Sequence, residues 1–481
     1  METEIRRLEA IARQLEPNGE RRERWLNAVA AYAGRFLDEI GTIPAYVAPE
    51  QDGRGLAGTP FSETGLGMEA ALGLLREHVD SRGVNPASDR FMGYIPGGGL
   101  YHSALGDYLA AIFNRYSGYF FASPGAVQME NMLVRWMAQV IGYPETSFGS
   151  LSSGGSLAHL SGIVTARDAH QIEGKRIRSA MVYMTDQVHH SVGKALQIAG
   201  LGSCIQQIIP VDERYRMRAD VLAQIIALDR KAGRQPWLLV GSAGTTNTGA
   251  IDPLPELSKI ATANDMWLHV DGAYGAFFAL CEEGRQKLSG MERSDSIVMD
   301  PHKTLFLPYG TGAILVRDGR QLVNAFQGDA DYLQDGIDAL EEISPADVSP
   351  ELTRHFRGLR LWLPLMLAGV APFRAALAEK LLLTRYFYEK IQTVAGFEVG
   401  PRPDLGVATF RYVPKRGDAN EFNRRLVQAI QQDGRVFLTS TRLGNKFVLR
   451  IAAGVFRTHL VQIEQAIAVL REKAKELEVS F

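Results

Sequence analysis

Cysteine is scarce in this sequence. Only Cys204 and Cys281 occur among 481 residues, and neither belongs to a C-x-x-C pair. A disulfide framework and a zinc ribbon are therefore excluded. No uninterrupted apolar run approaches the ~20 residues that span a bilayer, and the charged N-terminus, METEIRRLEAIARQLEPNGERRERW, contains no apolar signal core. These absences predict a cytoplasmic protein with no membrane partner.

The sequence also lacks an excess of either positive or negative charge. The 52 Lys and Arg residues nearly balance the 54 Asp and Glu residues, so the formal net charge is -2. No broad positive field favours nucleic acid or an anionic membrane. Glycine, by contrast, is in surplus, with 48 residues, or about a tenth of the chain against a usual ~7%. Without a G-x-y period, these glycines are expected to have local roles.

The N-terminal region predicts two amphipathic helices. Apolar residues recur at helical spacing from Ile5 to Leu15, and Asn18-Gly19 is a stop signal. A second apolar stripe runs from Trp25 to Ile40, followed by a Gly- and Pro-rich segment from Pro44 to Thr64. Because these helices have little core of their own, we expect them to pack on the main domain or on a partner subunit.

From about residue 130 to 320, short apolar strands alternate with helices. This pattern predicts a mostly parallel sheet buried on both faces, whose ligands bind at the carboxyl ends of the strands. The predicted strands are Ala180–Met184, Cys204–Val211, Trp237–Ser242, Met266–Val270, Ser296–Met299 and Ala313–Val316. The predicted helices between them include Val188–Ala199, Arg218–Lys231 and Pro253–Asn264.

The C-terminal third predicts a long helical region followed by a small α+β domain. The helical region begins after Phe356. The small domain is expected to contain strands Val407–Tyr412 and Phe447–Ile451, helices Glu421–Gln432 and His459–Glu476, and a hairpin through Gly444-Asn445.

Four polar segments follow predicted strand ends. Ser152 to Ser156 opens a predicted helix, where small residues let backbone N–H groups surround an anion such as phosphate. The same run is also an ordinary helix cap, and no G-K-[ST] follows to indicate a nucleotide P-loop. The other segments are Thr185 to His190, His269 to Tyr274, and Asp300 to Thr304.

The charged residues of these segments each allow two interpretations. Asp271 either caps a turn or holds a cationic ring nitrogen, and a metal at His269 and Asp271 is disfavoured because no third ligand is near. Lys303 is either a surface lysine or an amine nucleophile whose pKa is lowered by burial or by nearby positive charge. One ring of His189-His190 is suited to stack on an aromatic cofactor. Together, these groups meet the needs of pyridoxal 5'-phosphate.

The sequence resembles the group II pyridoxal-phosphate-dependent amino acid decarboxylases, and among them the aromatic L-amino acid decarboxylases. The similarity runs from about Phe91 to near the C-terminus. It is carried by FMGYIPGGG, YFFASPGAVQMENMLVRWM, LSSGGSLAHL, TDQVHHSV, GTTNTGAID, WLHVDGAYGA, DPHKTL, RHFRGLRLW and NKFVLRIAAG.

The resemblance implies an α/β architecture of fold type I, like that of aspartate aminotransferase, in a homodimer. We expect a helical N-terminal segment exchanged across the dimer (residues 1–100), a large cofactor-binding domain with a mostly parallel sheet (101–365) and a small C-terminal α+β domain (366–481).

The resemblance also implies a role for each site residue. Lys303 carries the cofactor in a Schiff base, Asp271 pairs with its ring nitrogen, His189 stacks on its ring and Tyr332, in a mobile loop from about Phe326 to Pro350, gives a proton to the substrate Cα. Decarboxylation would pass through an external aldimine and a quinonoid. The further cofactor-binding positions are Gly155, Ser156, Thr245, Ala273 and His302, and the substrate-binding positions are Tyr94, Pro96 and Thr353.

Several positions depart from the family pattern. Asp300 stands where Asn is usual, and its carboxylate would repel a phosphate unless it points away. Gly97 and Gly118 stand where larger residues line the substrate pocket, so we expect a wider wall there, while Thr353 replaces a glycine. The leading prediction is decarboxylation of an aromatic L-amino acid. The alternatives are a glutamate or diaminobutyrate decarboxylase and an aromatic aldehyde synthase, which Tyr332 disfavours because Phe is typical there.

Overall fold

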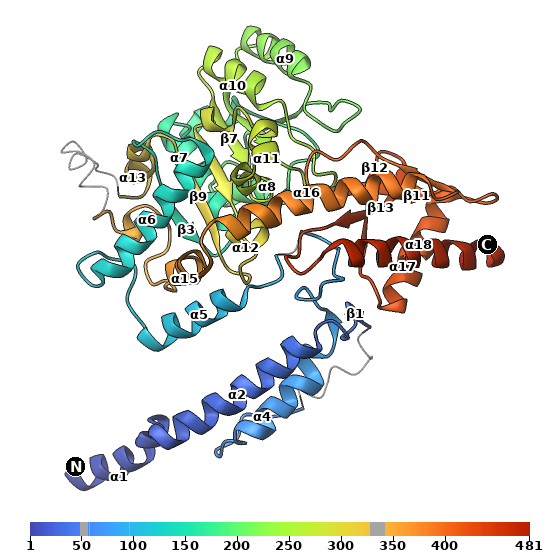
Figure 1. The fold of residues 1–481 in the computed structure, drawn as a ribbon. Helices are drawn as coiled ribbons and strands as arrows, with labels where there is room; N and C mark the ends of the chain where they lie inside the picture. The colour runs from blue at the N-terminus through green and yellow to red at the C-terminus, as the bar shows by residue number, and fades with distance from the viewer. Residues whose placement is uncertain (49–55, 57, 96, 328–341) are drawn as a thin grey trace.

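The N-terminal residues form an arm that projects from the rest of the molecule (Figure 1). The computed structural model describes residues 1–48, 56, 58–95, 97–327 and 342–481. The predicted break at Asn18-Gly19 is confirmed, and its physical cause is that the Asn18 side chain caps α2 by accepting the N–H of Arg21. The arm contains α1 (Glu2–Ala12), η1 (Arg13–Leu15), α2 (Gly19–Glu39), β1 (Tyr46–Val47), α4 (Met68–Leu75), η2 (Arg76–Asp80) and β2 (Gly83–Val84).

A seven-stranded sheet forms the centre of the described structure. Its spatial order is β3-β9-β8-β7-β6-β4-β5, and only β9 runs antiparallel to its neighbours. The predicted mostly parallel sheet is therefore confirmed, and β3 is a further strand that the pattern did not delimit. The strands are β3 (Phe148–Ser152), β4 (Ala180–Met184), β5 (Ile205–Ile208), β6 (Gln235–Ser242), β7 (Trp267–Asp271), β8 (Ser296–Met299) and β9 (Gly312–Val316).

Helices cover both faces of this sheet, as the apolar strands require. Successive residues of a strand point to opposite faces, and in β4 the side chain of Val182 joins one apolar core whereas that of Tyr183 joins the other. One face packs against α7 (Gly155–Ala169), α8 (His190–Ile198) and α13 (Gly319–Gln327). The other face packs against α6 (Pro124–Ile141), α9 (Ala219–Lys231), α10 (Leu254–Ala263) and η4 (Ala276–Leu280).

The helical region after Phe356 is broken into two helices. Helix α15 (Gly358–Ala368) ends at Gly369, whose φ is +69°, and α16 (Ala371–Gln392) starts with a proline in its first turn. Glycine adopts a positive φ without steric cost, so the chain turns sharply there. No single helix in the described ranges is long and apolar enough to cross a membrane; α15 and α16 would qualify only as a pair, bent by 94°.

Helix α16 joins the large sheet to a small C-terminal sheet (Figure 1). Its Phe373 and Leu377 pack in the core of the large sheet, whereas Phe387 and Ile391 pack in the C-terminal core. The predicted small α+β region is confirmed, with its hairpin at Gly444-Asn445. It contains β10 (Phe397–Val399), β11 (Val407–Tyr412), β12 (Thr439–Leu443), β13 (Lys446–Ala452), α17 (Ala419–Asp433) and α18 (Leu460–Ser480). The proposed domain boundaries stay predictions; the one after residue 365 falls inside α15.

Candidate active site

The four polar segments meet at the carboxyl edge of the central sheet. They follow β3, β4, β7 and β8, which run in the same direction and therefore end at one edge. A cavity of about 380 Å³ opens there. It is lined by Ser153, Gly154, Gly155, Ser156, Leu157, His159, His189, Ser191, Gly244, Thr246, Asp271, Ala273, Tyr274, Asp300, His302 and Lys303.

The Ser/Gly turn between β3 and α7 forms a cradle without bulky side chains. A Cβ added at Gly155 would lie 2.8 Å from Oδ2 of Asp300, and one at Gly312 would lie 2.6 Å from the backbone of Gly154. Glycine at these positions thus lets the ends of β3 and β8 and the start of β9 come together. The first N–H groups of α7 have no partner within the helix, and with the nearby serine hydroxyls they favour an anion.

Lys303 is held by a carboxylate three residues earlier. Helix α12 (Pro301–Thr304) carries Lys303, and its Nζ lies 2.9 Å from Oδ2 of Asp300. Burial alone would lower the pKa of Lys303, but Asp300 and Asp271 outweigh burial and raise it. The expected lowering of this pKa is wrong, because the carboxylates of Asp300 and Asp271 lie near the amine and favour its charged form.

Asp300 points toward the anion cradle rather than away from it. Its side chain is almost fully buried, and Oδ1 has no hydrogen-bond partner. The negative charge of Asp300 therefore faces the cradle, and the amine of Lys303 lies 2.9 Å from the same carboxylate.

Asp271 stands at the end of β7 and is kept ionised by its surroundings. Burial would raise its pKa, but His159 and Lys303 favour the charged form, so the pKa lies below its ordinary value. Oδ1 accepts the N–H of Ala273 at 3.2 Å, and Oδ2 faces Nε2 of His159 at 3.6 Å. A permanently ionised, partly enclosed carboxylate suits a cationic ring nitrogen.

His189 lines the cavity, whereas His190 is exposed and does not. His189 caps α8: its Nδ1 accepts the N–H of Ser191, which leaves Nε2 to carry the proton. Burial lowers the pKa of His189, so the imidazole is neutral near neutral pH. This placement agrees with the predicted division between the two rings.

His302 lines the cavity, but Thr245 does not. Nδ1 of His302 lies 2.5 Å from the carbonyl oxygen of Thr311, which fixes the ring beside Lys303. The hydroxyl of Thr245 is turned into its own loop, 2.9 Å from that of Thr248, and the next residue, Thr246, reaches the cavity instead. The expected contact from Thr245 is therefore assigned to Thr246.

The structure describes two of the three residues that were predicted to bind the substrate. Tyr94 and Thr353 are exposed and do not line this cavity. Pro96 and Tyr332 lie outside the described residues, as does most of the predicted loop from Phe326 to Pro350.

Gly97 and Gly118 do not widen a pocket wall. A Cβ at Gly97 would overlap the carbonyl oxygen of His302, and one at Gly118 would lie 2.5 Å from the carbonyl oxygen of Leu352. Backbone already fills both places, so each glycine permits a close approach of two chain segments. The wider wall that small side chains suggested is wrong for this reason.

Sequence reasoning assigned no role to several lining residues, among them His159, Thr246 and Tyr274. His159 lies on α7, one turn after the Ser/Gly cradle, and a histidine among small and apolar residues of a buried helix was the available signal. No group of three metal-ligating side chains occurs within the described ranges.

These residues fit pyridoxal phosphate. The backbone N–H groups of the glycine turn at Gly155 suit its phosphate, Lys303 offers an amine to its aldehyde, and the ionised Asp271 suits its ring nitrogen. His189 and Ala273 both line the same cavity and supply a flat ring and a small apolar side chain.

Comparison with known proteins points to the same chemistry. The family model described as "Pyridoxal-dependent decarboxylase conserved domain" matches residues 69–413. An aromatic-L-amino-acid decarboxylase from Bacillus atrophaeus is 34% identical over 424 residues, covering 87% of this chain and 88% of that protein. A phenylacetaldehyde synthase from Arabidopsis thaliana is 29% identical over 404 residues, covering 81% and 82% of the two chains. The crystal structure of Oryza sativa TDC with PLP and tryptamine superimposes with a TM-score of 0.87 at 25% identity, covering 96% and 99%.

The ion pair of Asp300 and Lys303 predicts how cofactor uptake depends on pH. A raised pKa means that Lys303 is protonated, and unreactive toward an aldehyde, until the pH approaches that pKa. Asp300→Asn removes the nearest negative charge, so the pKa falls and the neutral amine appears at lower pH. We expect the midpoint of the uptake rate against pH, followed by absorbance, to fall by about one unit.

Asp318→Asn is the matched control, because Asp318 pairs with the exposed Arg320 outside the cavity. Its midpoint should equal that of the parent protein. An Asp300→Asn protein with the parent midpoint would contradict the assigned role of this ion pair.

Proposed function

The chain belongs to the pyridoxal-dependent decarboxylase family, and we propose on this basis that it decarboxylates an aromatic L-amino acid to the corresponding amine and CO₂. The observation that carries the proposal is the convergence of Lys303, Asp271 and the Gly155 cradle on one cavity. An amine, a fixed carboxylate and an anion site at the ends of parallel strands are the groups that a pyridoxal phosphate enzyme needs.

Pyridoxal phosphate, when bound, supplies an aldehyde that condenses with amines and a pyridinium ring that accepts the electron pair left as CO₂ departs. The residues of the chain prepare that chemistry. Lys303 would hold the aldehyde of the cofactor through its amine, and the carboxylate of Asp271 would keep a proton on the ring nitrogen. His189 is neutral and lies at the cavity wall, where its flat ring is suited to restrict the orientation of bound aromatic groups.

We assign the proton delivered to the substrate Cα to the phenol O–H of Tyr332, with His189 assisting. Tyr332 follows the family motif in sequence and lies outside the described residues. A segment that covers the cavity during reaction would exclude water and oxygen from the carbanion.

The aromatic substrate class is supported by the relatives. The relative from Bacillus atrophaeus is an aromatic-L-amino-acid decarboxylase, and the aligned rice structure contains tryptamine, an aromatic amine. The alternatives are a non-aromatic substrate such as glutamate or diaminobutyrate, and an aldehyde synthase reaction like that of the Arabidopsis thaliana relative. The tyrosine at position 332 favours amine formation over the latter.

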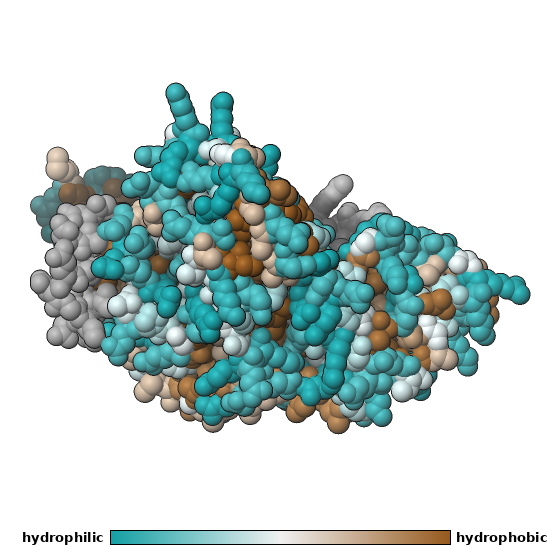
Figure 2. All heavy atoms as spheres, turned by 90° about the horizontal axis from the view of Figure 1, so that it is seen from above, coloured by the Kyte–Doolittle hydropathy of each residue, from teal (hydrophilic) through white to brown (hydrophobic). Residues whose placement is uncertain are grey.

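We also propose a homodimer in which the N-terminal arm packs on the second copy. No residue of α1 or α2 is buried, and Ile5, Leu8 and Ile11 are 57%, 51% and 53% exposed. Such a continuous apolar stripe is normally covered by another surface. The face seen from above, on the side away from the arm, is predominantly hydrophilic (Figure 2).

Cytoplasmic location and the absence of nucleic acid or membrane partners complete the proposal. Both cysteines are free and buried, which is compatible with a reducing compartment. A formal net charge of -2 gives no general attraction to polyanions.

The proposed reaction predicts a substrate ranking. CO₂ release from a panel of L-amino acids by the loaded enzyme should be fastest with tryptophan, tyrosine, phenylalanine or dopa, and at least about tenfold slower with glutamate and diaminobutyrate. Release only from acidic or basic amino acids would show that the aromatic assignment is wrong.

Tyr332→Phe should separate cofactor binding from proton delivery. The variant keeps the aromatic ring and loses the acidic proton, so amine formation should fall by about 10²-fold or more while cofactor binding is unchanged. Aldehyde and ammonia are measured in the same assay, because an unprotonated carbanion is open to oxidation. Unchanged amine formation would remove Tyr332 from the donor role.

The dimer is tested by analytical ultracentrifugation at micromolar concentration. The parent protein should sediment with twice the mass of one chain. Leu8→Glu places a charge in the apolar stripe of α1 and should shift the protein toward the monomer, whereas Glu9→Ala, on the same helix, should not. A fully active monomeric parent protein would contradict the proposal.

A further inference from the structure

Strand β7 carries three polar or aromatic side chains on one face. Trp267, His269 and Asp271 alternate along the strand and so point to the same side. Helix α7 covers this side, and it approaches closely because a Cβ at Gly162 would lie 2.8 Å from the ring of His269. This close approach brings His159 of α7 between His269 and Asp271.

The side chains form a continuous polar chain inside the protein. Nε1 of Trp267 donates to Oγ of Ser296 at 2.8 Å, and the same Oγ lies 2.7 Å from Nδ1 of His269. Nε2 of His269 lies 2.9 Å from Nδ1 of His159, whose Nε2 faces Asp271 at 3.6 Å. Ser296, His269 and His159 are at most 1% exposed, so water does not replace these links.

The chain satisfies all of its donors in one direction only. An indole N–H can only donate, so Ser296 accepts from Trp267 and has its own proton for Nδ1 of His269. His269 then carries its proton on Nε2 and donates to Nδ1 of His159, which leaves the N–H of His159 facing Asp271. In the reverse direction His269 donates to Ser296, and the buried hydroxyl proton of Ser296 has no acceptor among these side chains.

The charge states agree with this direction. Burial, with His159 beside it, lowers the pKa of His269 to about 3, so His269 is neutral at physiological pH. The titratable groups around Asp271 are His159 from α7, His189 from the start of α8 and Lys303 from α12. Of these, His159 is the one that the buried chain orders.

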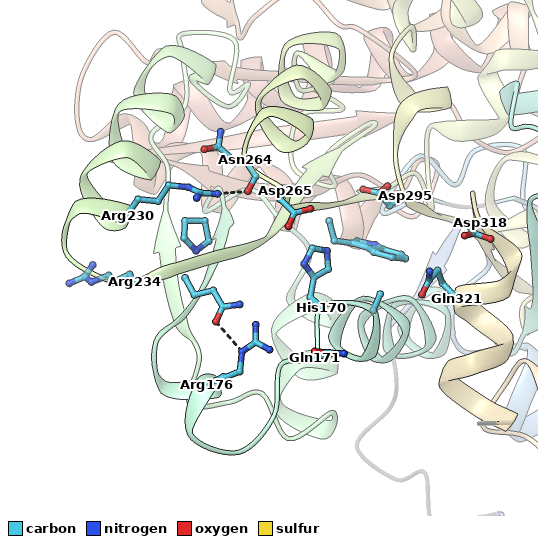
Figure 3. A pocket seen from close by; sticks show the side chains of 14 residues that line it. His170, Gln171, Arg176, Arg230, Arg234, Asn264, Asp265, Asp295, Asp318 and Gln321 are labelled. Carbon is cyan, nitrogen blue, oxygen red and sulfur yellow. Dashed lines mark hydrogen bonds between the residues drawn. The ribbon is translucent and has the colours of Figure 1, made fainter. Parts of the chain in front are cut away.

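This polar chain of side chains runs along β7 from the amino ends of the strands, at Trp267, to their carboxyl ends, at Asp271. Trp267, at its far end, lines a cavity of about 660 Å³ at the amino ends of the strands. His170 lies in the same cavity and packs edge-on against the indole, with ring centroids 6.3 Å apart (Figure 3). His170 therefore contacts Trp267, the far end of the polar chain, without belonging to that chain.

We propose that His159 and His269, ordered by Ser296 and Trp267, are positioning residues that hold Asp271 ionised and oriented for a protonated cofactor ring nitrogen. The proposal rests on the proposed function. It adds that His159 acts on Asp271 through its Nε2, the ring nitrogen that faces Oδ2, while its Nδ1 is linked to His269.

Two conservative variants of one residue separate this role from packing. The amide of His159→Gln reaches the position of Nε2 and can still donate to Asp271, whereas that of His159→Asn reaches only the position of Nδ1, toward His269. Each variant is loaded with pyridoxal phosphate labelled with ¹⁵N in the ring, and the ¹⁵N chemical shift reports the protonation of that nitrogen. The dissociation constant of the cofactor is measured on the same samples.

We expect His159→Asn to move the ¹⁵N shift toward the unprotonated ring and to weaken cofactor binding about tenfold, the loss of one hydrogen bond to a charged group. His159→Gln should stay close to the parent in both measurements. Ser296→Ala, which removes the hydroxyl that orients His269, should move the shift in the same direction by a smaller amount. His170→Asn, outside the chain, should change neither.

A His159→Asn protein with the parent shift and affinity would overturn the proposal, and so would equal effects of His159→Asn and His159→Gln. If His159→Asn does not fold, a parent-like ¹⁵N shift in Ser296→Ala overturns it. A parent protein that binds no pyridoxal phosphate would instead overturn the proposed function itself, so the two failures are distinguishable.

Discussion

An ionised carboxylate inside a protein is costly unless other groups stabilise it, and Asp271 is such a carboxylate. The backbone N–H of Ala273, the imidazole of His159 and the amine of Lys303 surround it. Each comes from a different segment, and these segments are held together only because β7 and β8 are neighbours in the sheet and α7 lies across them. The proposed chemistry depends on this one charge, since it determines whether the cofactor ring is a strong electron acceptor.

Close approach of backbone explains much of the glycine surplus. Gly155 and Gly312 let three strand ends meet around Asp300, Gly162 lets α7 approach β7, and Gly97, in the segment that follows the N-terminal arm, lets that segment contact the one that carries Lys303. In each case a Cβ would meet backbone or a buried side chain at less than ordinary contact distance. The glycines therefore do not provide empty space; they allow segments distant in the sequence to form a compact site.

Much of the fold and the principal site residues could be predicted from the sequence, because buried strands and strand-end motifs are local signals. The strands Ala180–Met184, Ser296–Met299 and Val407–Tyr412 were predicted with the observed bounds. The errors arose where the answer depends on how the fold places side chains and segments around a residue. The pKa of Lys303 follows from two carboxylates around it, and the space beside Gly97 and Gly118 is filled by other segments. His159 is 110 residues before its partner His269, and no local pattern links them.

The most direct test of the account is the identity of the lysine that carries the cofactor. The loaded enzyme is reduced with borohydride, digested, and mapped by mass spectrometry for the peptide that bears a pyridoxyl group. The account predicts the group on Lys303, in the peptide that contains Asp-Pro-His-Lys. Attachment at another lysine, or no covalent attachment in a protein that still releases CO₂ from an amino acid, would contradict it.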